Sequence, residues 1–328
     1  MVAGAGCKLA LSIATNLTVL CMLYGCMMGN YDGLYLPMMV LGYICSAPFF
    51  ALTVRTSQKE GQKASLMKYV RVAFICYIGV LVLLLLWKQG VPAVNLSLFG
   101  EGGITINLYT IAFIVCFGIG YGAYYSTADM PIPMVADCAD YETYRSGKYV
   151  PGIMGTIFSL VDKLVSSFAT LLTTVFTVYL IPGLNGSLPS TGVDLTPIIN
   201  SGYEGVKMSA IICVCLLPMA SWVITMFAMT KYDLSGDKLR EIQAVNAVRK
   251  EAISGGMSLE EAMNTWKTID QVPARFVNHS TKKKTISFLG KITDKIYNLI
   301  WGRKDHSLVE PSSNAIEIPE QYSNKEEH

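Results

Sequence analysis

Six stretches of this 328-residue chain are apolar and long enough to cross a membrane as helices. A bilayer core of roughly 30 Å requires about 20 apolar residues in an α-helix. The six stretches cover residues 8–29, 35–54, 68–88, 105–127, 152–182 and 207–230. Polar residues, glycine and proline interrupt the apolar pattern between them. The pattern predicts an all-α polytopic membrane protein, with a six-helix transmembrane bundle over residues 1–230.

The composition excludes an ordinary soluble domain. The chain is 52% hydrophobic and 15% charged, whereas soluble domains carry about 25% charged residues. Residues 1–230 hold 21 of the charged side chains and the last 98 residues hold 29. The net charge of +2 mixes both signs and accompanies no basic binding motif, so we expect no nucleic-acid partner.

Lysine and arginine gather in alternate connections, which predicts the orientation of the spans. Connections rich in these residues stay in the cytoplasm. They are Arg55, Lys59, Lys63 and Lys68 between the second and third spans, Arg145 and Lys148 between the fourth and fifth, and Lys231, Lys238 and Arg240 after the sixth. We therefore expect a multi-pass protein of the cell membrane, surrounded by lipid, with both termini in the cytoplasm.

The charged tail, residues 231–328, has a helical pattern of its own. A helix is expected over residues 236–253, and Ser258 with Glu261 forms a capping box that opens a second, shorter helix. Residues 282–304 repeat apolar positions every three or four residues among many lysines. This pattern fits either an amphipathic helix on an anionic membrane surface or a solvated helix packed on the bundle.

Cysteine and histidine give no sign of a metal site. The nine cysteines form no CxxC pair or Cys/His cluster, and the three histidines all lie in the tail. We expect the cysteines to be small buried thiols, and no metal site is predicted.

A polar stripe runs down the fifth span. Its members recur at spacings of three and four and are Thr156, Ser159, Lys163, Ser166, Thr170, Thr173 and Thr177. A charge at mid-membrane is retained where it has partners or a wet cavity, so Lys163 points to a substrate or ion pathway. The alternatives are helix packing through Ser and Thr and a pairing of Lys163 with Asp162. Adjacent helical residues lie about 100° apart, which makes that pairing awkward.

Two further residues are candidates for the same pathway. Asn16 lies inside the first span, one turn after Ser12. Tyr124 lies near the end of the fourth span, where an aromatic hydroxyl suits hydrogen bonding to a sugar. Tyrosine also belongs to ordinary interfacial belts, and that interpretation stays open for Tyr124.

The connection between the fourth and fifth spans is rich in charge. Its candidate residues are Asp137, Asp140, Glu142, Arg145 and Lys148. They suggest either a salt-bridge network that gates the cytoplasmic side or an Asp-x-x-Asp magnesium site for phosphoryl transfer. The interleaved cations would neutralise a metal site and no glycine-rich phosphate loop accompanies it, so the gate is favoured.

This segment resembles a transporter signature. The run Ala136-Asp137-Cys-Ala-Asp140-Tyr141-Glu142, followed by Arg145-Ser-Gly147-Lys148, Gly152, Phe158-Ser159 and Lys163, is similar to that of the glycoside–pentoside–hexuronide:cation symporters. These are major-facilitator transporters typified by the melibiose permease. The basic run from Arg55 to Lys63, which contains Gly61, also resembles a loop of that family. The resemblance covers residues 8–250, and it departs from the family at Asp162 and at Leu164-Val165.

The resemblance implies which part of a transporter this chain supplies. The six spans would correspond to helices seven to twelve, the carboxy-terminal half. Lys163 would lie beside the cation and sugar site, while Asp137, Asp140, Glu142 and Arg145 would work the cytoplasmic gate. The family's cation- and sugar-binding carboxylates come chiefly from the other half. The chain would then be a truncated reading frame, one half of a split transporter paired with an amino-terminal six-helix half, or a homodimer.

The sequence thus predicts symport of a sugar or glycoside, driven by Na⁺ or H⁺, with no cofactor and no covalent chemistry. Two other classes stay open. One is a polytopic membrane enzyme that holds Mg²⁺ on Asp137 and Asp140. The other is a membrane sensor in which the 98-residue tail carries the function.

Overall fold

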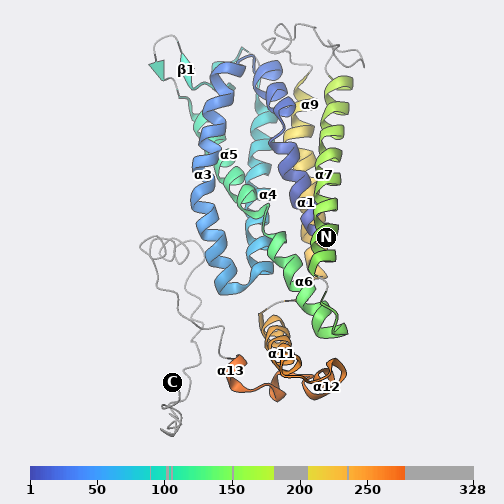
Figure 1. Ribbon diagram of the computed structural model, residues 1–328. Coiled ribbons are helices and arrows are strands. Elements are labelled where there is room, and N and C mark those ends of the chain that lie inside the picture. Colours follow the sequence, from blue (N-terminus) through green and yellow to red (C-terminus); the bar gives the residue numbers. More distant parts are fainter. Residues whose placement is uncertain are drawn as a thin grey trace, which may run out of the picture.

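The computed structural model describes residues 1–88, 90–100, 103–104, 106–149, 151–180, 206–234 and 236–277 of the chain. These residues form a bundle of long helices with a smaller helical unit below it (Figure 1). Five helices are long and apolar enough to cross a membrane, and a bent pair at the amino terminus makes a sixth span. The expectation of a multi-pass helical membrane protein is therefore confirmed.

The first span is broken in its middle. Helix α1 covers Val2–Ala14, α2 covers Leu17–Leu20, and the π-helical segment η1 covers Cys21–Met27. The two halves meet at an angle of 48°. Asn16 lies at the break, where its side chain accepts a hydrogen bond from the backbone N–H of Thr18 (2.9 Å) and so caps α2.

The second and third spans follow one another almost without a loop. Helix α3 covers Tyr31–Glu60 and α4 covers Gln62–Leu86. Only Gly61 lies between them, with a φ of 91° that favours glycine. The basic segment expected as a loop from Arg55 to Lys63 is therefore mostly helical, because one glycine is enough to reverse the chain.

The fourth span continues past the membrane as a second helix. A 3₁₀ turn η2 (Pro92–Val94) and a two-stranded antiparallel hairpin of β1 (Phe99–Gly100) and β2 (Gly103–Ile104) precede α5, Leu108–Thr127. Helix α6 covers Pro131–Ser146 and ends at Gly147, whose φ is 71°. Twenty residues of α5 are about 30 Å long, enough for the bilayer core, so α6 lies beyond it.

The segment from Asp129 to Pro151, expected to interrupt the chain between the fourth and fifth spans, is mostly the helix α6. Pro131 stands in the first turn of α6, where its missing N–H costs nothing, and Gly147 supplies the left-handed cap. Pro131 therefore begins this helix and Gly147 ends it, and neither interrupts it.

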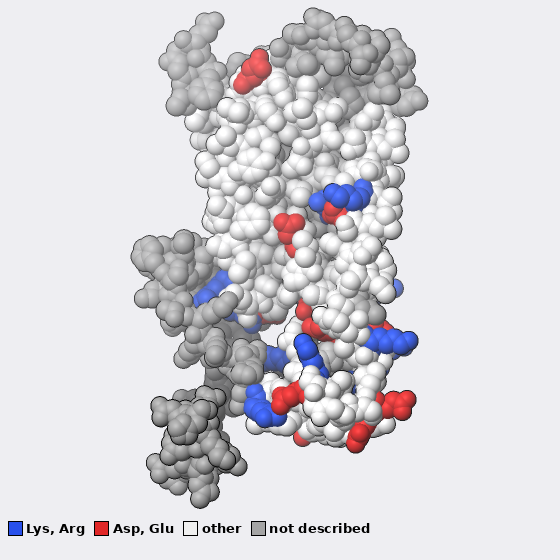
Figure 2. Space-filling view, viewed as in Figure 1, with Lys and Arg blue, Asp and Glu red and all other residues white. Residues whose placement is uncertain are grey.

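The remaining elements complete the bundle and begin the tail. Helix α7 covers Pro151–Leu180, and the last span is α9 (Lys207–Ile211), the π-helical η4 (Ile212–Leu216) and α10 (Leu217–Thr230). The tail contains α11 (Gly236–Ser254), α12 (Leu259–Thr265), the 3₁₀ turn η5 (Ile269–Gln271) and α13 (Ala274–Val277). Ser258 caps α12 as the capping box predicted. The amphipathic helix expected over 282–304 lies outside the described residues. Figure 2 shows most charged side chains of the visible face at the end that bears the tail.

Small residues allow the spans to approach closely. In α5, a Cβ on Gly122 would lie 2.8 Å from the carbonyl oxygen of Cys45 in α3. In α1, a Cβ on Gly6 would lie 2.8 Å from the carbonyl oxygen of Ser221 in α10. Such contacts are typical of helix packing in lipid. Lipid provides no hydrophobic driving force for helices to associate, so close packing of their backbones stabilises the contact instead.

The core of the bundle lies between α1, α4, α5 and α10, and α7 stands at its edge. Helix α5 packs against α3 and α4, while α1 packs against α10 and α7. In the most apolar stretch of the Leu108–Ser146 segment 56% of residues are buried, but in that of α7 only 6% are. This leaves the outer side of α7, with much of the polar stripe, uncovered by the helices that the structure describes.

Candidate functional site

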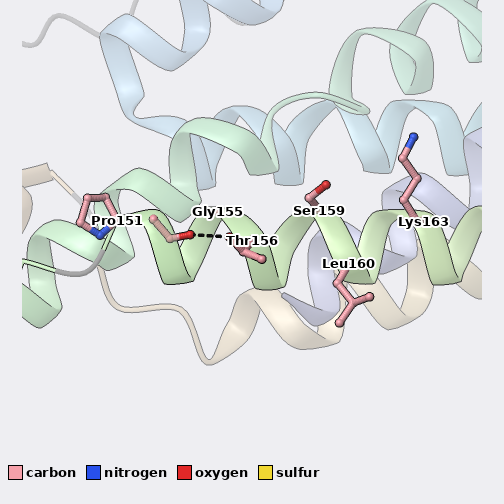
Figure 3. Close-up of a pocket in the computed structure, with 7 residues that line it drawn as sticks. Pro151, Gly155, Thr156, Ser159, Leu160 and Lys163 are labelled. Carbon is pink, nitrogen blue, oxygen red and sulfur yellow. Dashed lines mark hydrogen bonds between the residues drawn. The ribbon is translucent and has the colours of Figure 1, made fainter.

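The uncovered side of α7 is hollowed near its amino-terminal end. A pocket of about 570 Å³ lies there, here called the α7 groove, lined by Pro151, Gly152, Gly155, Thr156, Ser159, Leu160 and Lys163. In Figure 3 the side chains of Ser159 and Lys163 point to the same side of the helix, and that of Leu160 points to the opposite side. The first three members of the polar stripe therefore share one stretch of helix surface with two glycines, whereas Ser166 and Thr170 do not line the groove.

Two glycines keep the groove open. A Cβ placed on Gly152 or on Gly155 would meet nothing within 4 Å, so both positions face open space. Together with the short side chains of Thr156 and Ser159, they leave the backbone of α7 accessible to a ligand or to another helix.

The hydroxyls of the stripe are held by their own helix. Thr156 donates to the carbonyl of Gly152 (2.8 Å, Figure 3), Ser166 to that of Asp162 (2.8 Å) and Thr170 to that of Ser166 (3.2 Å). Each hydroxyl oxygen keeps lone pairs with which to accept a hydrogen bond from a ligand. Thr173 is buried, and the side chain of Thr177 lies outside the described residues.

Lys163 is exposed and forms no ion pair within the described part of the chain. Its neighbour Asp162 points elsewhere and pairs with Lys8 of α1, with 3.2 Å between Nζ and Oδ1. The pairing of Lys163 with Asp162, which the sequence made awkward, does not form in the residues that the structure describes. Lys8, Asp162 and Lys163 together leave one uncompensated positive charge, and it lies at the groove.

The other two pathway candidates lie away from the groove. Asn16 is half-buried at the break of the first span. Tyr124 is fully buried in the bundle core, with its ring 5.8 Å from that of Tyr77 and 5.6 Å from that of Trp222. Neither lines the α7 groove, although a broken helix such as the first span is where transporters commonly bind ions.

The five gate candidates all lie on α6 or just after it. Asp137 is buried, Asp140 and Glu142 are half-buried, and Arg145 and Lys148 are exposed. No ion pair joins them to one another in the part of the chain that the structure describes. The expected salt-bridge network within this segment is therefore not present in this conformation.

Burial changes the chemistry of the α6 carboxyls. Burial and, to a smaller extent, the nearby charge of Asp140 raise the pKa of Asp137 from its ordinary value of 3.8 to about 6. Burial also raises the pKa of Asp140. Both carboxyls therefore hold a proton more readily than a solvated aspartate.

Hydrogen bonds from the tail attach it to α6, whereas no ion pairs form within the α6 segment among the described residues. Arg249 of α11 is buried and donates to the carbonyl of Tyr144 (2.7 Å) and, from two nitrogens, to the carbonyl of Trp266 (2.9 and 2.6 Å). Asn246 donates to the carbonyl of Asp140 (2.8 Å). The hydroxyl of Tyr144 in turn donates to the carbonyl of Lys267 (2.7 Å). These bonds dock α11 and the following turns on α6.

Sequence reasoning missed Lys8 and Arg249. Lys8 is a single charge within an apolar run, and that alone was a signal for an intramembrane partner. Arg249 lies among many tail charges, and nothing in the sequence separates it from its solvated neighbours.

The α6 carboxyls also bear on the magnesium alternative. Within the described ranges no group of three or more His, Cys, Asp or Glu side chains lies close enough together to hold a metal ion. A magnesium ion would therefore have Asp137 and Asp140 alone as protein carboxylate ligands.

Comparisons with known proteins identify no relative of this chain. No family model, curated protein or solved structure matches the chain. The resemblance to the cation symporters accordingly rests on the residues that carry it.

Proposed function

We propose that this chain is the carboxy-terminal half of a cation-coupled sugar symporter of the major-facilitator class. In this proposal its six spans rock against a second six-helix bundle, and sugar and Na⁺ or H⁺ bind between the two. The proposal has both termini in the cytoplasm of a cell-membrane protein, as the distribution of lysine and arginine suggests.

The observation that carries the proposal is the unpartnered charge of Lys163 on a polar face that the described helices leave uncovered. A lysine exposed to lipid at mid-membrane costs about 2.5–3.5 kcal/mol even on the most lenient scale. A second bundle and a wet cavity between the two would remove that cost. The hydroxyls of Thr156 and Ser159 then face the same cavity and offer acceptors to a sugar.

Two other features support a moving bundle. The first span is discontinuous at Asn16, as in transporters that bind ions at broken helices. The charged segment that resembles the symporter gate forms a separate helix, α6, beyond the end of α5. A helix of this kind can shift without unravelling the span that it follows.

Cysteine accessibility tests the proposal. In a variant whose nine native cysteines are replaced, Ser159→Cys and Ile157→Cys are compared in membranes of the native host, where the proposed second bundle is present. Ile157 is exposed on α7, outside the groove, and lies about 200° around the helix from Ser159. A pathway predicts that a charged, membrane-impermeant thiol reagent modifies Ser159→Cys and not Ile157→Cys, and that melibiose slows the modification.

Equal reactivity at the two positions, or none at either, would contradict a water-filled pathway at the groove. Uptake of radiolabelled melibiose by vesicles that contain this chain alone as a monomer would contradict the half-transporter assignment.

A further inference from the structure

The π-helical segment η1 brings two cysteines together. Cys21 and Cys26 lie at its start and near its end, five residues apart. In a π-helix each residue is hydrogen-bonded to the fifth one along, so side chains at this spacing lie over one another, whereas in an α-helix they point about 140° apart. A hydrogen bond joins the two thiols, and neither cysteine is in a disulfide. A spacing that indicates no metal site in an α-helix therefore places two thiols in contact here.

Methionine adds further sulfur to the same segment. The dipeptide Cys-Met occurs at residues 21–22 and again at 26–27, so Met22 and Met27 form a second row of sulfur beside the thiols. The Sδ atom of Met22 accepts a hydrogen bond from the hydroxyl of Ser209 in α9 (3.1 Å). Met22, Cys26 and Met27 are buried, and Cys21 is half-buried. Segment η1 thus offers soft sulfur donors, and the thiol of Cys21 is the one that a solute reaches first.

The donor set selects a class of metal ion. Thiolate and thioether ligands favour Cu(I) over the harder cations that prefer oxygen. Cu(I) and Ag(I) bind linearly between two thiolates, and a single ion placed between two sulfurs already in contact needs no preformed cavity. Among the described residues no third His, Cys, Asp or Glu joins the pair. The four ligands of a structural zinc site are therefore missing, whereas a soft monovalent cation needs only two.

The charges around the pair are compatible with a bound cation. Both thiols lose their protons to solvent as they coordinate, so the complex of one monovalent cation with two thiolates carries one negative charge. Cys26 lies about one helical turn before Asn30, which is exposed where the first span ends. Helix α9, which packs against η1, begins at Lys207 and brings a positive charge to the same end of the bundle. Nearby water and this lysine both reduce the cost of the negative charge.

We propose that Cys21 and Cys26 form a binding site for one soft monovalent cation, Cu(I) or Ag(I), held between their two thiolates. Met22 and Met27 lie alongside and surround the ion with polarisable sulfur. The bound ion ties the start of η1 to its end and so stabilises the π-helical half of the broken first span. Neither cysteine lines the α7 groove, and the inference does not rest on the proposed function.

Cu(I) binding by two matched variants of the full-length chain tests the site. Each variant is purified in detergent, keeps two cysteines and has the other seven replaced by alanine. The first keeps Cys21 and Cys26. The control keeps Cys213 and Cys215, which are also buried in a π-helix, η4, but lie two residues apart and so point to different sides. With ascorbate as reductant and bicinchoninate as competing chelator, the first variant should retain one equivalent of Cu(I) and release two protons, and the control should retain none.

Two single changes in the first variant distinguish a ligand from its surroundings. Cys21→Ser removes a proposed ligand and should weaken Cu(I) binding by more than the roughly 10- to 100-fold typical of a group next to a metal ligand. Ser209→Ala removes only the hydrogen bond to Met22 and should have a smaller effect than Cys21→Ser. Equal effects of the two changes would contradict coordination by both thiolates.

Phenylarsine oxide gives a second measurement that does not depend on the folding of Cys21→Ser. Its arsenic condenses with two neighbouring thiols to form two As–S bonds, and its oxygen leaves as water with the two thiol protons. It should protect both thiols of the Cys21/Cys26 variant from a maleimide and leave those of the Cys213/Cys215 variant reactive. Protection in neither variant, equal retention of Cu(I) by both, or Zn²⁺ bound as tightly as Cu(I) would overturn the proposal.

Discussion

Lys8 of α1 and Asp162 of α7 form an ion pair, with 3.2 Å between Nζ and Oδ1. Both side chains are about a quarter to a third exposed (31% and 25%), so they neutralise one another at the edge of the bundle. The pair joins α7, which buries little of its surface, to α1. It also leaves Lys163, the next residue, without Asp162 as a local partner.

Removing one member of this pair should destabilise the bundle more than removing both. Lys8→Met leaves the Asp162 carboxylate unpaired in an apolar setting, and losses of about 3–5 kcal/mol are typical for a fully buried pair. Partial exposure should reduce the loss here. The double variant Lys8→Met/Asp162→Leu should recover most of it, as should the swap Lys8→Asp/Asp162→Lys. Thermal unfolding in detergent measures each variant; equal losses in the single and double variants would contradict a coupled pair.

The spans are predictable because lipid imposes a simple length and polarity rule on helices. The last span is expected over 207–230, and α9, η4 and α10 together cover Lys207 to Thr230. The sequence does not predict helix α6, because a proline followed by many charged residues indicates a break between helices. A proline in the first turn and a glycine after the last are also the signature of a helix. The choice between the two depends on what the segment packs against.

The candidate site is only partly predictable from the sequence. Periodicity alone places Thr156, Ser159 and Lys163 on one face of one helix, and in the structure all three line the α7 groove. Periodicity cannot tell that Asp162 reaches Lys8, because the two residues are far apart in the sequence and meet only through packing. The same holds for Arg249, whose partners are backbone carbonyls that any residue could supply.

Acid should stabilise the α6 region through Asp137. Its folded-state pKa of about 6 lies above the ordinary value of 3.8 because of burial and the neighbouring Asp140. Between about pH 4 and pH 6 the folded chain therefore binds more protons than the unfolded chain, and stability falls as the pH rises. The contribution is at most about 3 kcal/mol.

Unfolding temperatures at pH values from 4 to 7.5, measured against Asp137→Asn, check this pH dependence. The variant should lose most of the fall in stability across the window, with a smaller part left to Asp140, and should be the more stable protein at neutral pH. Asp233→Asn, at an exposed aspartate outside α6, is the matched control and should behave as the parent chain. A fall that persists unchanged in Asp137→Asn would assign it to another group.

Lys163→Met should act in opposite directions on stability and on transport. Removing an unpaired charge from the lipid-facing side of the isolated chain should stabilise it, by up to about 2.5–3.5 kcal/mol on the insertion scale. In the proposed two-bundle transporter the same change should abolish sugar uptake, because the charge at the groove is lost. Lys88→Met, at an exposed lysine after the end of α4, should do neither. Unchanged uptake in Lys163→Met would remove this residue from the pathway.

Arg249→Ala should release the tail from α6 without unfolding the bundle. The change removes a buried cation that supplies three hydrogen bonds to two carbonyls, and it leaves Tyr144 and Trp266 with unsatisfied acceptors. A hydrogen bond from a charged group contributes about 1.5–3 kcal/mol, so local opening should become roughly 10- to 100-fold more frequent. Amide hydrogen exchange across 236–277 measures the opening, and exchange in α4 and α5 should not change. Arg275→Ala is the matched control, because it removes an exposed ion pair from α13 to Glu251 of α11 (2.8 Å), and such pairs contribute little. If Arg275→Ala and Arg249→Ala accelerate exchange equally, the three hydrogen bonds of Arg249 are not what docks the tail on α6.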